Sequence, residues 1–424
     1  MKEFEKVIGY EDVKIELARI IDMMLNPVKY EKLGVKTPRG LLLEGAPGLG
    51  KTLMANCFIK ASKRKTFTIR KDIPDGDFIV HIKSIFAMAI KQTPSIVFLD
   101  DIDKFANEDE NHRNAEEFIT IQSCIDNCKN LDVFVLATAN ETSCLPNSLL
   151  RPGRFDKSIE ILAPRGIDAE NIARYYLSFK KVAKDVDPKN IARLLDGRSC
   201  ATLETVINEA GVYAGYENKK CIDEKDLIRA FMRVVYDSPE KISDENSKYI
   251  KNIAVHEAGH AVAGEVIEPG SINLVSVKGH GGNIGGFTSF KNDDDYFKNK
   301  KFMENRVISL LAGKAATEIV YGEGDVGASG DIERAFDIVE RFIDHYCFNG
   351  FQNHLLSTRN RPIANVALDN KYRSIQQTID NYYQQAKKII VDNREFLEKL
   401  TDALVDKKVL VYGEIQAIKA SCGA

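Results

Sequence analysis

Several features that would place a chain in a special class are missing from this 424-residue sequence. No stretch approaches the ~20 consecutive apolar residues that a membrane-spanning helix needs, and the charged start, MKEFEKVIGYEDVK, is not a signal peptide. The eight cysteines are scattered without a CxxC pair, which is typical of reduced thiols in a cytosolic protein. A net charge of −3 gives no electrostatic reason to expect a nucleic-acid partner. The sequence therefore predicts a cytoplasmic protein with no membrane segment in this chain.

The first part of the chain alternates short apolar runs with helical stretches. The runs at 41–43, 95–99 and 133–137 each lead into glycine or polar residues. Runs of this length are typical of buried strands in a parallel sheet, whose carboxyl ends meet at one edge and form the ligand site. We therefore expect a doubly wound α/β domain with its ligand at that edge.

The rest of the chain is mainly helical. Amphipathic patterns at 202–210 and 223–235 predict a small helical lid, and the polar, turn-rich stretch 237–248 is the best linker candidate. A glycine-rich stretch at 275–290 alternates like strand edges, and 374–418 carries long helical periodicity. The domains that we expect are 1–163 for the α/β core, 164–238 for the helical lid, 239–249 for the linker and 250–424 for a mainly helical domain.

A glycine-rich loop follows the first apolar run and fits the pattern GxxxxGK[ST]. Such a loop leaves backbone N–H groups free to surround phosphates at a helix N-terminus, where the helix dipole favours anions. We expect Lys51 to reach the β- and γ-phosphates of ATP and the Thr52 hydroxyl to bind Mg²⁺; the alternative is a glycine-rich turn without a ligand. The predicted nucleotide-binding residues are Gly45, Ala46, Pro47, Gly48, Leu49, Gly50, Lys51, Thr52 and Asp100.

Polar residues at the ends of the later apolar runs complete this site. Asp100 offers a carboxylate for the metal, and Asp101 offers a second one that can activate the attacking water. Asn140, after the next run, is placed to position that water. Together with the loop, these residues predict a site for ATP hydrolysis.

A second motif, His-Glu-Ala-Gly-His, occupies 256–260. On a helix, His256 and His260 share one face and can bind one Zn²⁺, which leaves Glu257 beside the attacking water as its general base. The flanking residues are apolar and contain no proline, as a buried helix requires. Zinc needs a third protein ligand, and among the other histidines only His280, in a glycine-rich stretch, is a candidate.

The stretch after Asn140 resembles the second region of homology of AAA proteins. It reads Leu-Leu-Arg-Pro-Gly-Arg-Phe-Asp at 149–156. In that family the two arginines reach the γ-phosphate bound by the neighbouring subunit, and Arg151 and Arg154 match their positions. Arginine suits this role because its planar, permanently charged group spans phosphate oxygens. The resemblance implies a ring in which no subunit completes its own site; the alternative for both arginines is surface charge.

Together the motifs resemble the FtsH family of AAA proteases over essentially the whole chain. The resemblance rests on the motif at 256–260, on Gly-Gly-Phe-Thr at 285–288 and on Ala-Ser-Gly-Asp-Ile at 328–332. It implies that Asp331 is the third zinc ligand, whereas the residues alone also allow Asp331 to be the N-cap of a helix. It further implies that Glu318 lies near the metal and orients a ligand.

Such a resemblance implies an ATP-dependent zinc endopeptidase that degrades proteins as a homohexamer and uses Zn²⁺, ATP and Mg²⁺. Family members usually carry N-terminal transmembrane helices, so the chain would be a soluble relative or the cytoplasmic part of a membrane-anchored protein. Two alternatives remain: a zinc peptidase whose weak ATPase mainly organises the ring, and a non-proteolytic AAA remodelling protein with a vestigial protease domain.

Two positions depart from the family pattern. Asp101 stands where the family usually has glutamate, and a base that is ~1 Å too far from its water can slow a reaction greatly. The family's pore loop carries an aromatic-apolar-glycine triplet, whereas this chain has Pro-Asp-Gly at 74–76, with Phe78 nearby as a substitute after a register shift. These differences predict slow ATP turnover and a weak grip on threaded substrate.

Overall fold

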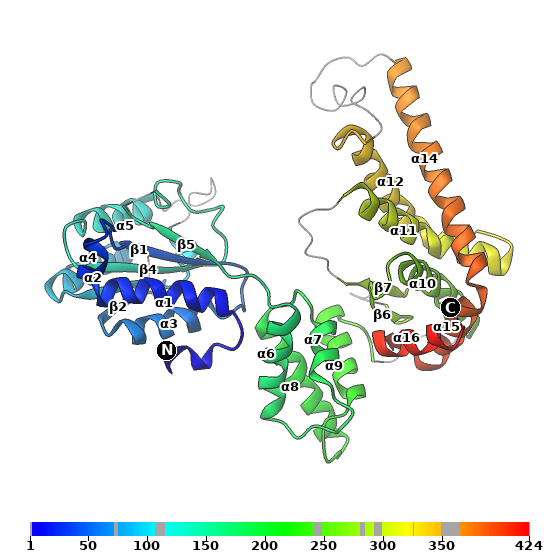
Figure 1. Cartoon of the computed structure of the whole chain (residues 1–424), viewed down its shortest axis with the longest axis horizontal. Coiled ribbons are helices and arrows are strands. Elements are labelled where there is room, and N and C mark those ends of the chain that lie inside the picture. Colours follow the sequence, from blue (N-terminus) through cyan, green and yellow to red (C-terminus); the bar gives the residue numbers. More distant parts are fainter. Residues whose placement is uncertain are drawn as a thin grey trace. The chain divides into compact units, whose positions relative to one another are not determined.

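The computed structural model describes residues 2–71, 75–106, 115–151, 153–240, 247–279, 285–291, 299–324, 326–348 and 365–423 (Figure 1). The chain forms two compact units, Met1–Ile222 and Asp223–Ala424. Part of the linker expected at 239–249 lies outside the described residues. The finer domain limits stay a prediction.

A five-stranded parallel sheet forms the centre of the first unit, as the apolar runs predict. Its strand order is β2-β3-β4-β1-β5, and every pairing is parallel. The strands are β1 (Gly40–Glu44), β2 (Lys65–Ile69), β3 (Ser95–Leu99), β4 (Val133–Ala139) and β5 (Lys157–Glu160). β3 and β4 are buried along their whole length, because helices cover both of their faces.

Successive side chains of each strand point to opposite faces of this sheet. Val133 and Val135 pack into one core with residues of α4 and α5. Phe134 points the other way and meets Phe58 of α3, with ring centroids 5.6 Å apart. The expected doubly wound arrangement is therefore confirmed. The elements around the sheet are η1 (Lys2–Lys6), α1 (Glu11–Leu25), α2 (Pro27–Glu31), α3 (Lys51–Ser62), α4 (Asp75–Lys91), η2 (Ile102–Lys104) and α5 (Ala115–Asn127).

Short helices follow the sheet, as the amphipathic patterns predict. They are α6 (Gly166–Ser178), α7 (Pro188–Leu194), α8 (Cys200–Tyr216) and α9 (Glu224–Tyr236), of which α9 falls in the second compact unit. Side-chain caps fix where three of them begin: Asp187 accepts a hydrogen bond from the Lys189 N–H, Ser199 from the Thr202 N–H and Asp223 from the Asp226 N–H.

The second unit is mainly helical, with a small antiparallel sheet of strand order β7-β6-β8. Strand β7 lies within the stretch 275–290 that alternates like strand edges in the sequence, whereas β6 begins three residues before that stretch and only its end falls inside it. The elements are α10 (Ser247–Ile267), β6 (Ile272–Ser276), β7 (Phe287–Phe290), α11 (Lys300–Tyr321), η3 (Val326–Ala328), α12 (Ser329–Asp344), α14 (Asn365–Asp392), α15 (Arg394–Lys407), β8 (Val409–Val411) and α16 (Tyr412–Ala420).

Small residues bring α10 and α11 very close together. A Cβ atom added at Gly259 would lie 2.6 Å from both the Ala312 carbonyl oxygen and the Ala316 methyl group. The neighbouring Ala258, Ala261 and Ala315 are completely buried in the same core. Gly259 is therefore required by the packing of α10 against α11.

A buried carboxylate ties the end of α10 to the last helix. Glu265 is fully buried, and its oxygens accept hydrogen bonds from the Gly270 N–H at 2.9 Å and the Ile272 N–H at 3.1 Å. The Gln416 amide of α16 donates a further bond of 2.7 Å to the same carboxylate. These hydrogen bonds hold the turn that leads into β6 and also fix the position of α16 against the end of α10.

Within the described ranges, none of the helices combines the length and the apolar character that crossing a bilayer requires.

We expect Gly259→Ala to destabilise the protein by about 1–3 kcal/mol, because the added methyl group overpacks the contact with α11. This outcome opposes the intrinsic preference of helices for alanine over glycine, which is worth about 1 kcal/mol. Gly215→Ala in α8 is the matched control, since no heavy atom lies within 4 Å of the added Cβ position. Urea unfolding should show a lower midpoint only for Gly259→Ala. Equal stability of this variant and the wild type would contradict the close contact.

Candidate metal centre and nucleotide site

The His-Glu-Ala-Gly-His motif lies in the middle of α10, and its two histidines and its glutamate are buried together. His256 and His260 lie one turn apart on the same helix face, as their spacing requires. Their exposed fractions are 8% and 5%, and that of Glu257 is 6%. Polar side chains this deeply buried need specific partners.

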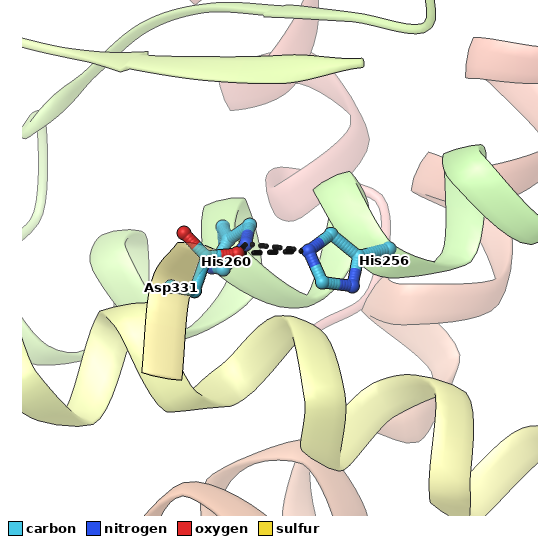
Figure 2. A group of neighbouring side chains, drawn as sticks. All are labelled: His256, His260 and Asp331. Atoms are coloured by element: carbon cyan, nitrogen blue, oxygen red, sulfur yellow. Dashed lines mark hydrogen bonds and ion pairs between the residues drawn. The ribbon is translucent and has the colours of Figure 1, made fainter. Parts of the chain in front are cut away.

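Asp331 reaches this place from the first turn of α12 (Figure 2). Its Oδ2 atom lies 3.0 Å from His256 Nε2 and 3.0 Å from His260 Nε2, and the two nitrogens are 3.0 Å apart. No other group of three or more His, Cys, Asp or Glu side chains with this geometry occurs in the described part of the chain. Two imidazole nitrogens and a carboxylate oxygen that converge in this way suit a zinc ion.

The interpretation of Asp331 as a helix N-cap is wrong. Ala328 is the N-cap of α12 and forms no side-chain cap, while Asp331 is the third residue of the helix. Its Oδ1 atom accepts a hydrogen bond of 2.6 Å from Arg334, which leaves Oδ2 directed at the histidines. The competing candidate, His280, lies outside the described residues.

Backbone contacts orient one of the histidines for metal binding. His260 Nδ1 donates to the Ser309 carbonyl oxygen at 2.7 Å, so its Nε2 carries the free lone pair that a ligand needs. Gly313 of α11 lies against both rings, since an added Cβ would be 2.6 Å from His260 Nε2 and 2.7 Å from His256 Cε1. Gly313 therefore leaves the room that the ligands occupy.

Glu257 is held beside these ligands by Thr288 of β7. The Thr288 hydroxyl lies 2.8 Å from Glu257 Oε2 and 3.1 Å from the Glu257 carbonyl oxygen. Burial raises the pKa of Glu257, against the opposing effect of the two histidines. The residues border a cavity of about 460 Å³, which also touches Gly285, Gly286 and Phe287. A carboxylate in this setting is a stronger base than an exposed one.

The glycine-rich loop has the shape expected of a phosphate site. It follows β1 and ends at Gly50, the N-cap of α3, whose φ of 89° favours glycine. Lys51 donates to the Gly45 and Ala46 carbonyl oxygens at 2.7 and 2.8 Å, and to Asn140 Oδ1 at 2.9 Å. Burial lowers the pKa of Lys51, and nearby aspartates oppose this effect. The loop folds around its own lysine, with Asn140 beside it.

Asp100 and Thr52 meet at the carboxyl end of β3. The Thr52 hydroxyl lies 3.1 Å from Asp100 Oδ1, which also accepts a bond of 2.8 Å from Thr138 of β4. Arg70, the residue after β2, holds Oδ2 with Nε at 2.9 Å and Nη2 at 2.8 Å. The sequence motifs do not include Arg70 or Thr138. Their position at the carboxyl edge of the sheet is the signal that could have found them.

Asp101 adopts a left-handed conformation with φ of 55°. Its N–H donates to the Thr138 hydroxyl at 2.9 Å. The carboxylate accepts a bond of 2.6 Å from Lys104 and a longer one of 3.4 Å from Asn140 Nδ2. Asp101 and Asn140 are thus brought together, as their predicted roles require.

Comparison with known proteins agrees with both sites. Residues 41–162 match the ATPase family associated with various cellular activities (AAA), and residues 241–418 match Peptidase family M41. The ATP-dependent zinc metalloprotease FtsH 1 of Thermomicrobium roseum is 31% identical over 98% of this chain and 68% of its own length. This chain belongs to the FtsH family.

Other FtsH proteins show similar likeness. FtsH 2 of Phytoplasma mali is 30% identical over 98% of this chain, which spans 62% of that relative's length. FtsH of Bacillus subtilis is 29% identical over 98% of this chain and 69% of its own length. The chain therefore corresponds to about two thirds of these FtsH proteins.

The two arginines of the AAA motif lie in different settings. Arg151 is exposed, whereas Arg154 forms a two-pronged ion pair with Asp126 of α5 at 3.2 and 2.9 Å and also donates to the Ser148 carbonyl oxygen. Arg154 holds the pKa of Asp126 at about 2. Within the described contacts, neither arginine is bonded to the glycine-rich loop of its own chain.

Two expectations drawn from the family are wrong. Glu318 pairs with Lys387 at 2.7 Å and Lys314 at 3.4 Å and accepts a hydrogen bond from Tyr383, so it orients no zinc ligand. It lies five residues beyond Gly313, about 140° further around α11, and so faces away from the histidines.

Phe78 cannot serve as a pore-loop residue, because its exposed fraction is 0%. Its ring packs edge-on against Phe105 at 5.3 Å, and it belongs to the stripe by which α4 covers the sheet. Residues 74–76, the expected pore-loop position, lie outside the residues whose side chains are described.

We expect Asp331→Asn to lower zinc content strongly, since a neutral amide is a poor ligand and Oδ2 contacts both histidines. Asp337→Asn is the matched control, because Asp337 is an exposed aspartate on the same helix. Metal analysis of the purified proteins measures the difference. Full zinc occupancy in Asp331→Asn would remove this residue from the ligand set.

Proposed function

We propose that this chain is an ATP-dependent zinc endopeptidase that degrades proteins as a homohexameric ring. The observation that carries the proposal is the convergence of His256 Nε2, His260 Nε2 and Asp331 Oδ2 beside the buried carboxylate of Glu257. A vestigial protease domain has no need to keep all four residues in this arrangement. A non-proteolytic remodelling protein is therefore the weaker alternative.

Each residue at this centre has a role that follows from its contacts. His256, His260 and Asp331 would hold the zinc ion, which supplies a Lewis acid and lowers the pKa of water. Glu257 takes the proton from the water that attacks the scissile carbonyl. The Thr288 hydroxyl fixes the Glu257 carboxylate through Oε2, and the Ser309 carbonyl fixes the His260 ring through Nδ1.

The strand β7 gives the substrate a place to bind as an extended chain. It lies at one edge of the sheet order β7-β6-β8, and Phe287 and Thr288 border the cavity at the metal centre. An extended peptide can add to such an edge by backbone hydrogen bonds, without regard to its side chains. This arrangement supports cleavage within protein chains of varied sequence.

The first unit would hydrolyse ATP. Backbone N–H groups of the loop from Gly45 to Gly50 would surround the phosphates, with Lys51 at the β- and γ-phosphates. Thr52 and Asp100 would hold Mg²⁺, and their 3.1 Å contact supports this role. Asp101 would accept the proton of the attacking water, positioned by Asn140.

We further propose that Arg151 and Arg154 act on the ATP of a neighbouring subunit. Their lack of contact with the loop of their own chain is consistent with this role. The pair with Asp126 holds the Arg154 side chain in one orientation, so little conformational entropy would be lost when phosphate binds. The protein would work in the cytoplasm or on the cytoplasmic side of a membrane, on protein substrates.

Glu257→Gln should abolish cleavage of casein while zinc content and ATP turnover stay near the wild-type values. Glutamine keeps the shape of the side chain but cannot accept the proton of water. The measurements are casein degradation with Zn²⁺, with and without ATP, and metal analysis of the same samples. Cleavage that survives above a few per cent of the wild-type rate would exclude Glu257 as the base.

Arg154→Ala should bind ATP but hydrolyse it at least ~100-fold more slowly, given the usual contribution of such arginines. Mixing it with Asp101→Asn, which would bind ATP without hydrolysing it, should restore part of the turnover. Arg174→Ala, at an exposed arginine of α6, is the control. Full ATP turnover by a monomeric protein, identified by sedimentation, would rule out a site shared between subunits.

A further inference from the structure

A second cavity lies directly beside the metal centre. It has a volume of about 340 Å³ and lies between α10, β7, α11 and α12. Phe290 and Arg306 border both this cavity and the one that contains the predicted zinc ligands. Ser309, whose carbonyl oxygen holds His260, is also part of its lining. A substrate bound at the metal centre can therefore place a side chain in this cavity.

The cavity combines apolar walls with polar atoms that have no partner. Ser271 Oγ and Asn305 Oδ1 are both buried and form no hydrogen bond. A buried polar atom without a hydrogen-bond partner is destabilising, so a ligand that bonds to it gains affinity. The walls come from Ile267, Phe290, Phe302, Met303 and Ile338.

Arg306 gives the cavity its charge. Its guanidinium carbon lies 4.1 Å from the centroid of the Phe290 ring, a cation–π contact that fixes the plane of the group. In the described part of the chain Arg306 forms no hydrogen bond or ion pair, so its N–H donors are free. Burial lowers the pKa of the Arg306 guanidinium and Arg334 acts in the same direction, whereas the carboxylate of Asp331 opposes both; arginine stays charged.

The other charged side chains of the lining are Lys291 and Glu268, so positive charge exceeds negative charge. An apolar side chain would fill the space but would leave Arg306, Ser271 and Asn305 without partners. A carboxylate accepts hydrogen bonds from the guanidinium and the serine hydroxyl, and from the Asn305 NH₂ group after a half-turn of that amide.

We propose that this cavity binds an acidic side chain of the substrate next to the scissile bond, and that Arg306 determines this specificity. The inference rests on the proposed protease function. The carboxylate would pair with a half-buried cation whose N–H groups have no hydrogen-bond partner among the described residues, while the methylene groups of glutamate would contact the apolar walls. Acidic residues near the cleaved bond would thus direct where the protein cuts.

The test uses the full chain with Zn²⁺ and ATP·Mg²⁺ on a peptide mixture, with cleavage sites mapped by mass spectrometry. The wild type should cut with Glu or Asp enriched at one position within about two residues of the cleaved bond. Arg306→Gln should reduce kcat/KM for the preferred peptide about tenfold relative to the same peptide with Gln at that position. Arg306→Glu should shift the preference to Lys or Arg. Arg373→Gln, an exposed arginine of α14, should change nothing.

A binding measurement separates this inference from the proposed function. Glu257→Gln protein, loaded with zinc, should bind a fluorescent acidic peptide, and adding Arg306→Gln should weaken binding about tenfold at unchanged zinc content. Arginine-dependent binding without cleavage by the wild type would refute the protease function but support the subsite. Cleavage without a preference for acidic residues would refute the proposed subsite and leave the protease function intact. The same conclusion would follow if the acidic preference and the peptide affinity both survived Arg306→Gln.

Discussion

The contact between α10 and α11 is the constraint on which the metal centre depends. Gly259 lets the two helix backbones approach, and Gly313 lets α11 pass beside the imidazole rings of His256 and His260. The same approach brings the Ser309 carbonyl oxygen to His260 Nδ1. The packing of α10 against α11 therefore sets the distance of His260 from α11, the orientation of its ring and its tautomer. Larger side chains at either glycine would move a helix by more than the tolerance of a metal site.

At the nucleotide site a parallel sheet, instead of a pair of helices, brings the functional residues together. Parallel strands end at one edge, so Asp100, directly after β3, and Thr138 of β4 meet there, and Arg70 joins them from the end of β2. In both units, then, functional groups come from segments far apart in the sequence. The regular elements position these groups, whether a group lies within a helix or in the segment that directly follows a strand.

Much of this could be predicted from the sequence because the informative patterns are local. The apolar runs predict the parallel sheet, the spacing of His256 and His260 places both on one helix face, and the glycine-rich loop marks its own function. Contacts made between elements leave no such pattern. Gly313 and Ser309 have no local signature, because their importance arises from the register of one element against another. Thr288 belongs to the motif at 285–288, but the motif does not show that its hydroxyl contacts Glu257. The pore-loop role predicted for Phe78 is wrong for the same reason, because only the packing of α4 shows that its ring is buried.

The buried carboxylate of Glu265 has a consequence for the order of events during synthesis. It joins the helix that carries the zinc ligands to α16, and the two segments are about 150 residues apart in the chain. Until the ribosome has released α16, Glu265 lacks its Gln416 partner and the turn into β6 is not braced from that side. The first unit needs none of these residues for its core, so we expect it to fold earlier. The emerging chain would then complete its nucleotide-binding unit before the unit that carries the zinc ligands.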